Sequence, residues 1–537
     1  MRKITEAFFV SLGGLSLLTS CQPTQKKQKR LNVLIAISDD QSFSFTSFSG
    51  CRFIKTPGFD RVAKSGVCFS NCYAGSPGSA PSRSSLVTGR HHWQNEQSGQ
   101  HASSWMKKYI PMVDMFSAAG YLTGATGKGV APFRYARSKA DSLWRKTNAA
   151  GVLDNAIQYT KNHDPRTAKG INKTDYYENF LAFMKHRKKD QPFYFWYGST
   201  EPHRAYEKDS WKHNGKKLAS VDVPGFLPDN ATIRGDLLDF GVEVEWFDTH
   251  LVRMLNYLKS IDELENTIVI VTGDNGMPFP RAKANCFEYG AHVPLAISCP
   301  QLIPSGRIVK DPIGFIDLAP TLFELTGVSS SGMLPMSGRS IAKTLESTQS
   351  GVVDSSKEYV FSGRERHSSS RWQNVGYPQR AVRSKQYLYL WNMKPERWPA
   401  GAPQALKKGT EELQPMYGLD EKGLAHSDWA FTDIDASPSK DYLMKHHAEK
   451  EISYYFELAV FKRPEYELYD IVKDPYCLTN LINNPAYKKI EEKMNQVLVT
   501  ELKRSKDPRM GDNPEVFDTY KRYSHIRQFP KPDWAKN

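Results

Sequence analysis

The chain has 537 residues, of which 39% are hydrophobic and 24% charged, and this composition excludes a disordered, collagen-like or repeat-built protein. It carries 72 lysine and arginine residues against 58 acidic ones, so its formal net charge is +14. A positive field favours polyanionic partners, namely nucleic acid, anionic lipid or a sulfated or phosphorylated glycan. Because the chain exceeds the ~250–300 residues that one hydrophobic core supports, we expect two domains.

The N-terminus predicts export. Two basic residues precede the apolar run 7–18, which is too short to span a bilayer and is typical of a signal peptide. The run ends in Leu-Thr-Ser-Cys at 18–21, which resembles a bacterial lipobox. That resemblance implies cleavage before Cys21 and lipidation of its thiol, and an ordinary secretory signal is the alternative.

We therefore expect a lipoprotein signal peptide over residues 1–20 and a basic tether over residues 21–30. The protein would be exported and held to a bacterial membrane, at the periplasmic face or the cell surface, by its lipid anchor only. An exported, tethered protein argues against a nucleic-acid role, so we expect the positive charge to meet an anionic glycan.

Apolar runs after the tether predict strands that are buried on both faces of a parallel sheet: 32–37, 192–197 and 267–272. A helix is predicted over 250–260, where apolar residues recur at intervals of three and four positions. Strands that alternate with helices indicate an α/β fold. Since ligands of open α/β sheets gather at the carboxyl ends of strands, we expect the polar residues after these strands to form one site.

The pattern changes near residue 355 to short aromatic, β-rich pieces such as 386–391. We therefore expect a larger α/β domain over 31–355 and a smaller C-terminal α+β subdomain over 356–537.

One motif gives the strongest indication of function. The segment 79–90, Ser-Ala-Pro-Ser-Arg-Ser-Ser-Leu-Val-Thr-Gly-Arg, resembles the signature of the type I sulfatases. Further segments similar to that family follow in its order, among them Gly127-Lys128, Asp274-Asn275-Gly276 and the stretch 467–481, and the resemblance covers 32–485. It implies an alkaline-phosphatase-like sandwich: a large, mostly parallel central sheet flanked by helices, and a smaller C-terminal α+β domain with an antiparallel sheet. It also implies that residues 31–355 form the catalytic domain and that residues 356–537 complete the substrate pocket.

Four oxygen donors predict a metal site. Asp39 and Asp40 follow the first predicted strand, and Asp274 and Asn275 follow the third. An Asp-Asp pair after one strand can equally cap a helix. Donors from two strand ends favour a hard cation, and we expect Ca²⁺.

The resemblance also implies the catalytic roles. Ser79 would be oxidised to formylglycine, whose hydrate is the nucleophile, and a plain serine would need an activating base. Arg83 would hold the hydrate and the metal shell, and Lys128 and Lys283 would neutralise the sulfate oxygens. His203 would donate a proton to the leaving group.

The sequence departs from the family at two positions. Val130 stands where many relatives have the histidine of Gly-Lys-x-His, so the group that deprotonates the hydrate is unassigned. Thr200 stands where many have a second histidine. Neither change affects the predicted nucleophile or metal ligands.

The substrate is indicated by local similarity to the heparan N-sulfatase (sulfamidase) branch, carried by 201–204 and 277–280. In that branch a segment similar to 366–380 contributes to the pocket, which implies that Arg364 and His367 contact a carboxylate or hydroxyl of the sugar. A place in the domain interface is the alternative for both residues.

We thus predict hydrolysis of sulfate esters or sulfamates on sulfated glycans of the glycosaminoglycan type, with N-sulfoglucosamine as the lead. Activation would require a serine-accepting sulfatase-maturing enzyme as a partner. Two alternatives remain: a phosphodiesterase or phosphonate hydrolase of the same superfamily, and an inactive lipoprotein that binds sulfated glycan.

Overall fold

The computed structural model describes residue 1 and residues 29–536. The predicted signal peptide, apart from Met1, lies outside the described residues, and so do Cys21 and most of the predicted tether. Within the described residues, no helix is long and apolar enough to cross a bilayer.

An eight-stranded sheet forms the centre of the molecule, in the order β3-β4-β1-β5-β6-β2-β7, with β8 also paired to β2. Its strands are β1 (Asn32–Ser38), β2 (Val67–Tyr73), β3 (Leu122–Gly127), β4 (Phe193–Gly198), β5 (Thr267–Gly273), β6 (His292–Ser298), β7 (Arg307–Val309) and β8 (Ile313–Gly314). Only the pairs that involve β6 are antiparallel. The predicted strands are β4, β1 and β5, which lie side by side, and the predicted fold class is confirmed.

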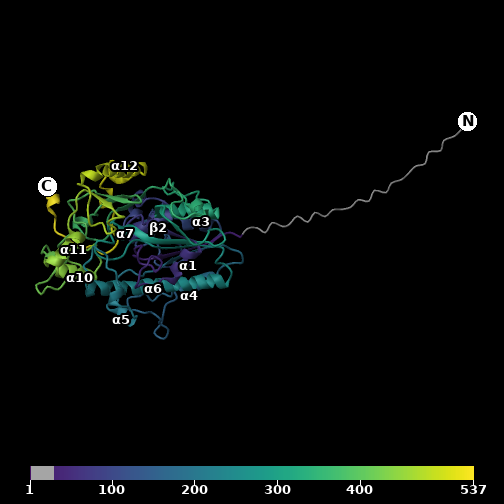
Figure 1. Cartoon of the computed structure of the whole chain (residues 1–537), viewed down its shortest axis with the longest axis horizontal. Helices are drawn as coiled ribbons and strands as arrows, with labels where there is room; N and C mark the ends of the chain where they lie inside the picture. The colour runs from purple at the N-terminus through teal and green to yellow at the C-terminus, as the bar shows by residue number, and fades with distance from the viewer. Residues whose placement is uncertain (2–28, 537) are drawn as a thin grey trace.

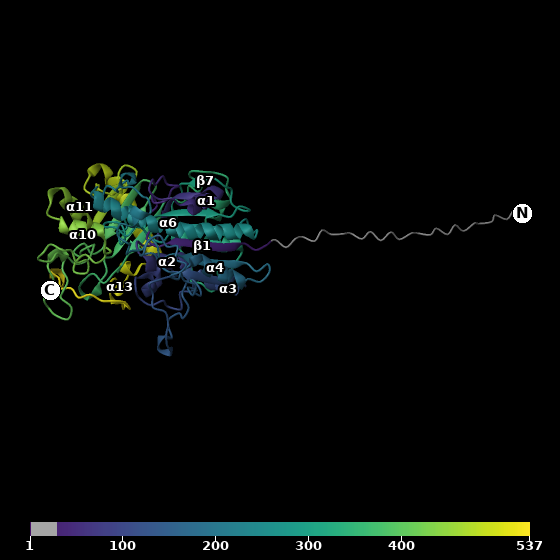
Figure 2. The same cartoon turned by 90° about the horizontal axis from the view of Figure 1, so that it is seen from below.

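Helices cover both faces of this sheet (Figures 1 and 2). Val33, Ile35 and Ile37 pack on one face with helices α2 (Ser79–Thr88), α3 (Met112–Ala118) and α8 (Leu318–Thr326). Leu34 and Ala36 pack on the other face with α1 (Pro57–Ser65), α4 (Tyr176–Lys185) and α6 (Ala231–Ser260). Because both faces are covered, the run 33–37 is entirely apolar and does not alternate with polar residues.

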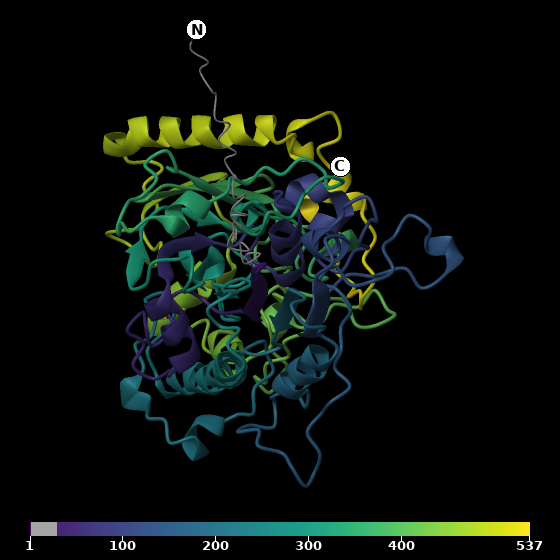
Figure 3. The same ribbon diagram turned by 90° about the vertical axis from the view of Figure 1, so that its right-hand side faces the viewer.

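A second, antiparallel sheet occupies the C-terminal part, in the order β12-β11-β10-β9. Its strands are β9 (Val360–Arg364), β10 (Gln379–Arg383), β11 (Tyr387–Asn392) and β12 (Tyr466–Asp470). One face is covered by α12 (Lys488–Arg504), the long helix at the top of Figure 3. The other face packs on Cys286 and Phe287, which belong to the segment that follows β5. The boundary between residues 355 and 356 stays a prediction.

The remaining helices are short and lie in the connections. They are α5 (Ser210–His213), α7 (Glu288–Ala291), α9 (Ala342–Glu346), α10 (Pro438–Lys445), α11 (Lys450–Val460) and α13 (Val516–Thr519). Helix α6 is much longer than the predicted 250–260. The prediction missed its first half because buried acidic residues there hide the apolar period.

Candidate active site

The predicted metal ligands meet at the carboxyl ends of β1 and β5, which are adjacent strands. Carboxylate oxygens of Asp39, Asp40 and Asp274 lie within 4.8 Å of one another, and the side chains are buried. The Asn275 amide donates to Asp40 Oδ1 at 2.7 Å, and the Asp40 main-chain N–H donates to Asp274 Oδ1 at 2.9 Å. Buried carboxylates at this spacing require compensating positive charge.

Ser79 is the first residue of α2 and points at these carboxylates. Its Oγ donates to Asp39 Oδ1 at 2.9 Å and lies 3.4 Å from Asn275 Oδ1. The Lys128 ammonium donates to the same Oγ at 3.1 Å. The serine side chain thus stands at a helix N-terminus, where the backbone dipole favours negative charge.

Arg83 lies one helical turn after Ser79 and is fully buried. Its Nε donates to Asp274 Oδ2 at 2.8 Å, and its Nη1 donates to the main-chain oxygens of Lys128 at 3.0 Å and Gly129 at 3.1 Å. Burial opposes the charge on Arg83, but Asp274 and Asp39 outweigh it and raise the pKa of the guanidinium. Arg83 therefore connects the carboxylates to the loop that carries Lys128.

The two predicted lysines flank the carboxylate group. Lys128 follows β3, and its ammonium pairs with Asp39. Lys283 Nζ donates to Asp40 Oδ2 at 2.6 Å. Burial alone would raise the pKa of Asp39, but Lys128, together with His203 and Arg83, holds it well below its usual range.

His203 follows β4 and is the most accessible of the predicted catalytic side chains. Its Nδ1 lies 2.6 Å from the main-chain oxygen of Arg204. Because a carbonyl oxygen only accepts, we assign the proton of the ring to Nδ1. Nε2 is 4.0 Å from Asp40 Oδ2, and the side chain is 39% exposed.

The structure adds one carboxylate that the sequence analysis missed. Asp435, from the segment before α10, accepts from Lys283 Nζ at 2.9 Å and forms a second acidic group with Asp40 and His203. Burial raises the pKa of Asp435, but Lys283 and His203 reverse the effect and hold it low. No local pattern marks Asp435, because only the packing of the C-terminal part brings it here.

The two predicted substrate contacts lie in different surroundings. Arg364 is buried, and its Nη2 donates to Asp433 Oδ2 at 2.6 Å and to the Pro399 oxygen at 2.9 Å. His367 lies against the start of α2, where a Cβ added at Gly78 would come within 3.0 Å of its Nδ1. The structure thus places His367 next to Gly78, the residue before Ser79, and pairs Arg364 with Asp433.

The structure also places Val130 and Thr200, the two positions at which the sequence departs from the family. Val130 is fully buried in the main core. The Thr200 hydroxyl lies 2.9 Å from the hydroxyl of Tyr176 and donates to Glu201 Oε1 at 3.0 Å. Among the described residues, neither of these two side chains forms a hydrogen bond with the Ser79 hydroxyl.

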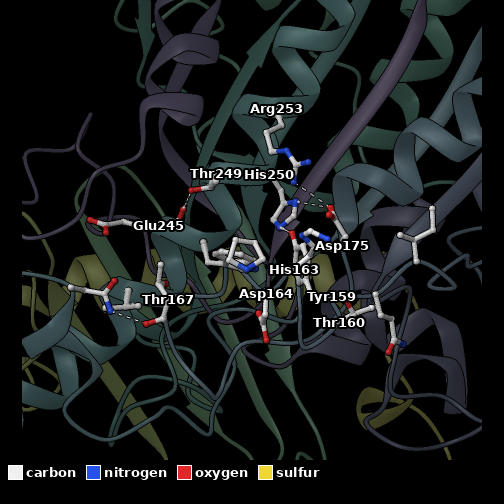
Figure 4. A pocket seen from close by; sticks show the side chains of 16 residues that line it. Tyr159, Thr160, His163, Asp164, Thr167, Asp175, Glu245, Thr249, His250 and Arg253 are labelled. Atoms are coloured by element: carbon white, nitrogen blue, oxygen red, sulfur yellow. Dashed lines mark hydrogen bonds and ion pairs between the residues drawn. The ribbon is translucent and has the colours of Figure 1, made fainter.

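A cavity of about 270 Å³ opens at this site. Its lining comprises Asp39, Lys128, Gly170, Asn172, Thr200, Glu201, His203, Arg204, Ala205 and Glu243. A larger cavity of about 1010 Å³ lies between α6 and the segment 157–167. Figure 4 shows His250 and Arg253 directed toward Asp175 in that larger cavity, and none of the predicted catalytic residues lines it. The smaller cavity is therefore the candidate active site.

The site combines a hydroxyl at a helix N-terminus, buried oxygen donors for a cation, two ammonium groups and a partly exposed imidazole. Such an arrangement suits the binding of a tetrahedral oxyanion and the transfer of a proton to its leaving group.

Comparisons with known proteins identify the family of the chain. The Sulfatase family model matches residues 31–328. Human N-sulphoglucosamine sulphohydrolase is 23% identical over 514 residues, which covers 89% of this chain and 91% of the human protein. An ulvan-active sulfatase of Formosa agariphila is 22% identical over 513 residues, covering 89% and 78%.

Solved structures show the same fold. A protein in complex with its substrate D-glucosamine-2-N,6-O-disulfate superposes with a TM-score of 0.61 at 18% identity, covering 91% of this chain and all of that one. The family model spans more than half of this chain, and it includes the strands that carry Asp39 and Asp274. The chain belongs to the sulfatase family, and the protein is a sulfatase.

Proposed function

We propose that this sulfatase removes sulfate groups from sulfated glycans, as esters or sulfamates, with formylglycine made from Ser79 as nucleophile and Ca²⁺ as cofactor. The observation that carries the proposal is the place of the Ser79 Oγ, 2.9 Å from Asp39 Oδ1 and 3.1 Å from Lys128 Nζ. The names of its relatives, which include a sulphoglucosamine sulphohydrolase and ulvan-active sulfatases, support a saccharide substrate.

The residues present fit a calcium ion. Asp39, Asp40, Asp274 and Asn275 offer only oxygen ligands, they converge from two strand ends, and they are buried. Oxygen-only donor sets with several carboxylates are what Ca²⁺ prefers in proteins. When bound, the ion supplies positive charge next to the side chain at position 79.

The surroundings of Ser79 also fit formylglycine, which when formed supplies an aldehyde hydrate as the attacking group. Asp39 accepts the hydrogen bond from the side-chain oxygen at this position, and Lys128 donates to it. Arg83 keeps its charge in the buried site and holds Asp274 in place. The residue is therefore oriented by groups that are themselves fixed.

Lys128 and Lys283 bind the oxygens of the sulfate group and stabilise the charge that develops on them. His203 then supplies the proton that the departing oxygen or nitrogen needs. Its Nδ1–H donates to the Arg204 carbonyl, which sets the orientation of the ring. The proton that is transferred is the second one, which Nε2 carries when the ring is in its imidazolium form.

We also propose that the protein is exported and lipid-anchored through Cys21, on the evidence of the N-terminal sequence. Metabolic labelling with a fatty acid tests this directly: the wild-type protein is expected to be labelled, and the Cys21→Ser variant is not.

The decisive experiment is the mass of the peptide that carries position 79, from protein produced together with a serine-accepting maturing enzyme. A loss of two hydrogens is expected, together with release of sulfate from N-sulfoglucosamine, glucosamine 6-sulfate or ulvan oligosaccharides. The Ser79→Ala variant made in the same cells controls for contaminating sulfatase. Converted protein that releases no sulfate from any of these substrates would contradict the proposal.

A further inference from the structure

Glu243 is a buried carboxyl group that the mechanism above does not use. It lies in the middle of α6, is 1% exposed, and lines the same cavity as Asp39, Lys128 and His203. A long helix of the core thus directs an acidic side chain into the active site.

The carboxyl group is not satisfied by the protein. Among the residues that the structure describes, Glu243 Oε1 has no hydrogen-bond partner although it is shielded from solvent. Glu201 lines the same cavity and provides the contrast, because both of its oxygens accept hydrogen bonds. The donors to Glu201 are the main-chain N–H of Asn172 and the hydroxyls of Tyr176, Ser199 and Thr200. A buried oxygen without a partner destabilises the fold, so a ligand is the natural source of its missing bond.

Gly170 lies against this oxygen and lines the same cavity. A Cβ added at Gly170 would lie 2.9 Å from Glu243 Oε1 and 2.7 Å from the Ala205 main-chain oxygen. Any other residue at position 170 would therefore crowd the carboxyl group. Glycine brings the backbone close and keeps the space in front of Oε1 free of a side chain.

The charges around Glu243 indicate what it binds. Burial raises the pKa of Glu243 well above its usual value, and Glu201 adds to the effect. Arg204 opposes it, but its guanidinium is paired with both oxygens of Asp236, at 2.7 and 2.8 Å. The raised pKa favours the uncharged form of this carboxyl group, and an uncharged acid can both donate and accept a hydrogen bond. An uncharged hydroxyl is a better match for such a group than an ammonium ion.

We propose that Glu243 is a specificity-determining residue that binds a hydroxyl group of the sugar ring carrying the scissile sulfate. This inference rests on the proposed function and deepens it. The cavity has a volume of about 270 Å³, slightly below the ~300–1,000 Å³ of typical ligand pockets. Because it is this small, a sugar ring whose sulfate lies at Lys128 would also lie close to Glu243.

The test compares two substrates on one enzyme. N-sulfoglucosamine and glucosamine 6-sulfate present ring hydroxyls, whereas 4-methylumbelliferyl sulfate has no sugar ring. In Glu243→Ala we expect kcat/KM for the sugar sulfates to fall about 10-fold or more, as for loss of one hydrogen bond, and the aryl sulfate rate to change less than about 2-fold. Glu243→Gln, which keeps a donor and an acceptor, is expected to lose less than Glu243→Ala.

Glu245→Gln is the matched control, because Glu245 lies on the same helix but bonds Lys216 and the main chain of Lys55. It is expected to leave both rates unchanged. All proteins are compared at equal conversion of Ser79, measured by peptide mass.

Equal losses on sugar and aryl sulfates in Glu243→Ala would overturn the inference, because Glu243 would then act through the fold or the reaction itself. Unchanged rates on both would overturn it as well. Failure of the proposed function is distinguishable, since converted wild-type protein would then release sulfate from neither class of substrate.

Discussion

At the scale of single residues, the candidate active site contains buried positive and negative charges that compensate one another. Asp39 and Asp274 are both buried, yet Asp39 remains ionised because Lys128, His203 and Arg83 surround it. The pKa of Asp274 is raised to about 6, because burial and the neighbouring Asp39 outweigh the attraction of Arg83. Each of these groups therefore depends on the others.

Arg83 offers the clearest test of this dependence. Removing one partner of a buried ion pair leaves an uncompensated charge, so we expect Arg83→Ala to lower the free energy of unfolding by about 3–5 kcal/mol. Chemical denaturation measures this loss, and Arg137→Ala, at an exposed position, is the control. Arg83→Lys restores a charge but loses the hydrogen bonds to the main-chain oxygens of Lys128 and Gly129, so it should recover only part of the lost free energy of unfolding. A loss under 1 kcal/mol in Arg83→Ala would contradict this account.

Asp435 gives a second prediction, on affinity. It shares Lys283 with Asp40, so Asp435→Asn removes negative charge beside the sulfate position and leaves Lys283 with one carboxylate partner. We expect inorganic sulfate to inhibit the variant about 3- to 10-fold more tightly, as for a change of about one charge near the surface. We expect kcat to fall, because Lys283 is less well positioned. Inhibition constants measure the first effect, and weaker inhibition by sulfate would refute it.

Residues such as Ser79 and Asp274 were predictable, because each follows a strand or opens a helix within a recognisable motif. Asp435 and Glu243 were not predictable. Asp435 reaches the site only when the C-terminal part packs on the segment after β5. Glu243 lies in the first half of α6, where buried acidic residues hide the apolar period. Long-range contacts of this kind leave no trace in local sequence.

At the scale of elements, buried acidic residues explain why the part of α6 before residue 250 was not predicted. Its inward-facing acidic residues serve other elements. Asp248 accepts from the main-chain N–H groups of Gly58 at 2.7 Å and Phe59 at 2.8 Å, at the start of α1. Asp239 likewise accepts from the N–H groups of Asp209 and Trp211 beside α5. Carboxylates that cap neighbouring helices replace apolar residues at core positions and disrupt the hydrophobic period.

Asp248 provides the prediction at this scale. Asp248→Ala leaves two buried N–H groups of α1 without their acceptors, so we expect it to lower the free energy of unfolding by about 1–3 kcal/mol. Asp512→Ala, at an exposed position, is the control. Denaturation curves for both variants provide the measurement, and equal stability of the two would show that the cap contributes nothing.

The segment between β5 and α7 shows how elements determine the site together. Arg281 donates to the main-chain oxygen of Leu458 at 2.9 Å and also bonds the oxygen of Cys477. Lys283 lies two residues further on, so its position is fixed by the C-terminal part of the chain. The candidate active site therefore includes residues on both sides of the predicted boundary at 355, Lys283 before it and Asp435 after it.

At the scale of the whole molecule, buried ion pairs join the C-terminal tail to the smaller sheet. Arg380 bonds Asp507 and Glu365, and Glu365 also pairs with Arg509 at 2.7 Å. The two sheets were predictable from the family resemblance, and three adjacent strands of the larger one were predictable from apolar runs. The ionic contacts that hold the tail were not, because a charged residue in sequence is most often exposed.

Buried histidines add a pH dependence to the whole fold. Burial lowers the pKa values of His92, His250 and His367 to about 3. The unfolded chain binds a proton at each near its ordinary pKa of about 6.5, whereas the folded chain does not until about pH 3. The stability that these groups contribute is therefore complete above about pH 6.5 and is lost as the pH falls toward 3, by up to about 1.4 kcal/mol per pH unit for each histidine.

His250 isolates one of these contributions, because it lies away from the active site, beside Asp175 and Arg253. We expect His250→Gln to unfold at a lower temperature than the wild type near pH 7, and we expect the gap to close as the pH is lowered through about 6 to 4.5. Melting temperatures across this range measure the gap, and the exposed His186→Gln should follow the wild type throughout. A gap that stays constant with pH would mean that His250 accepts its proton in the folded protein as readily as in the unfolded chain.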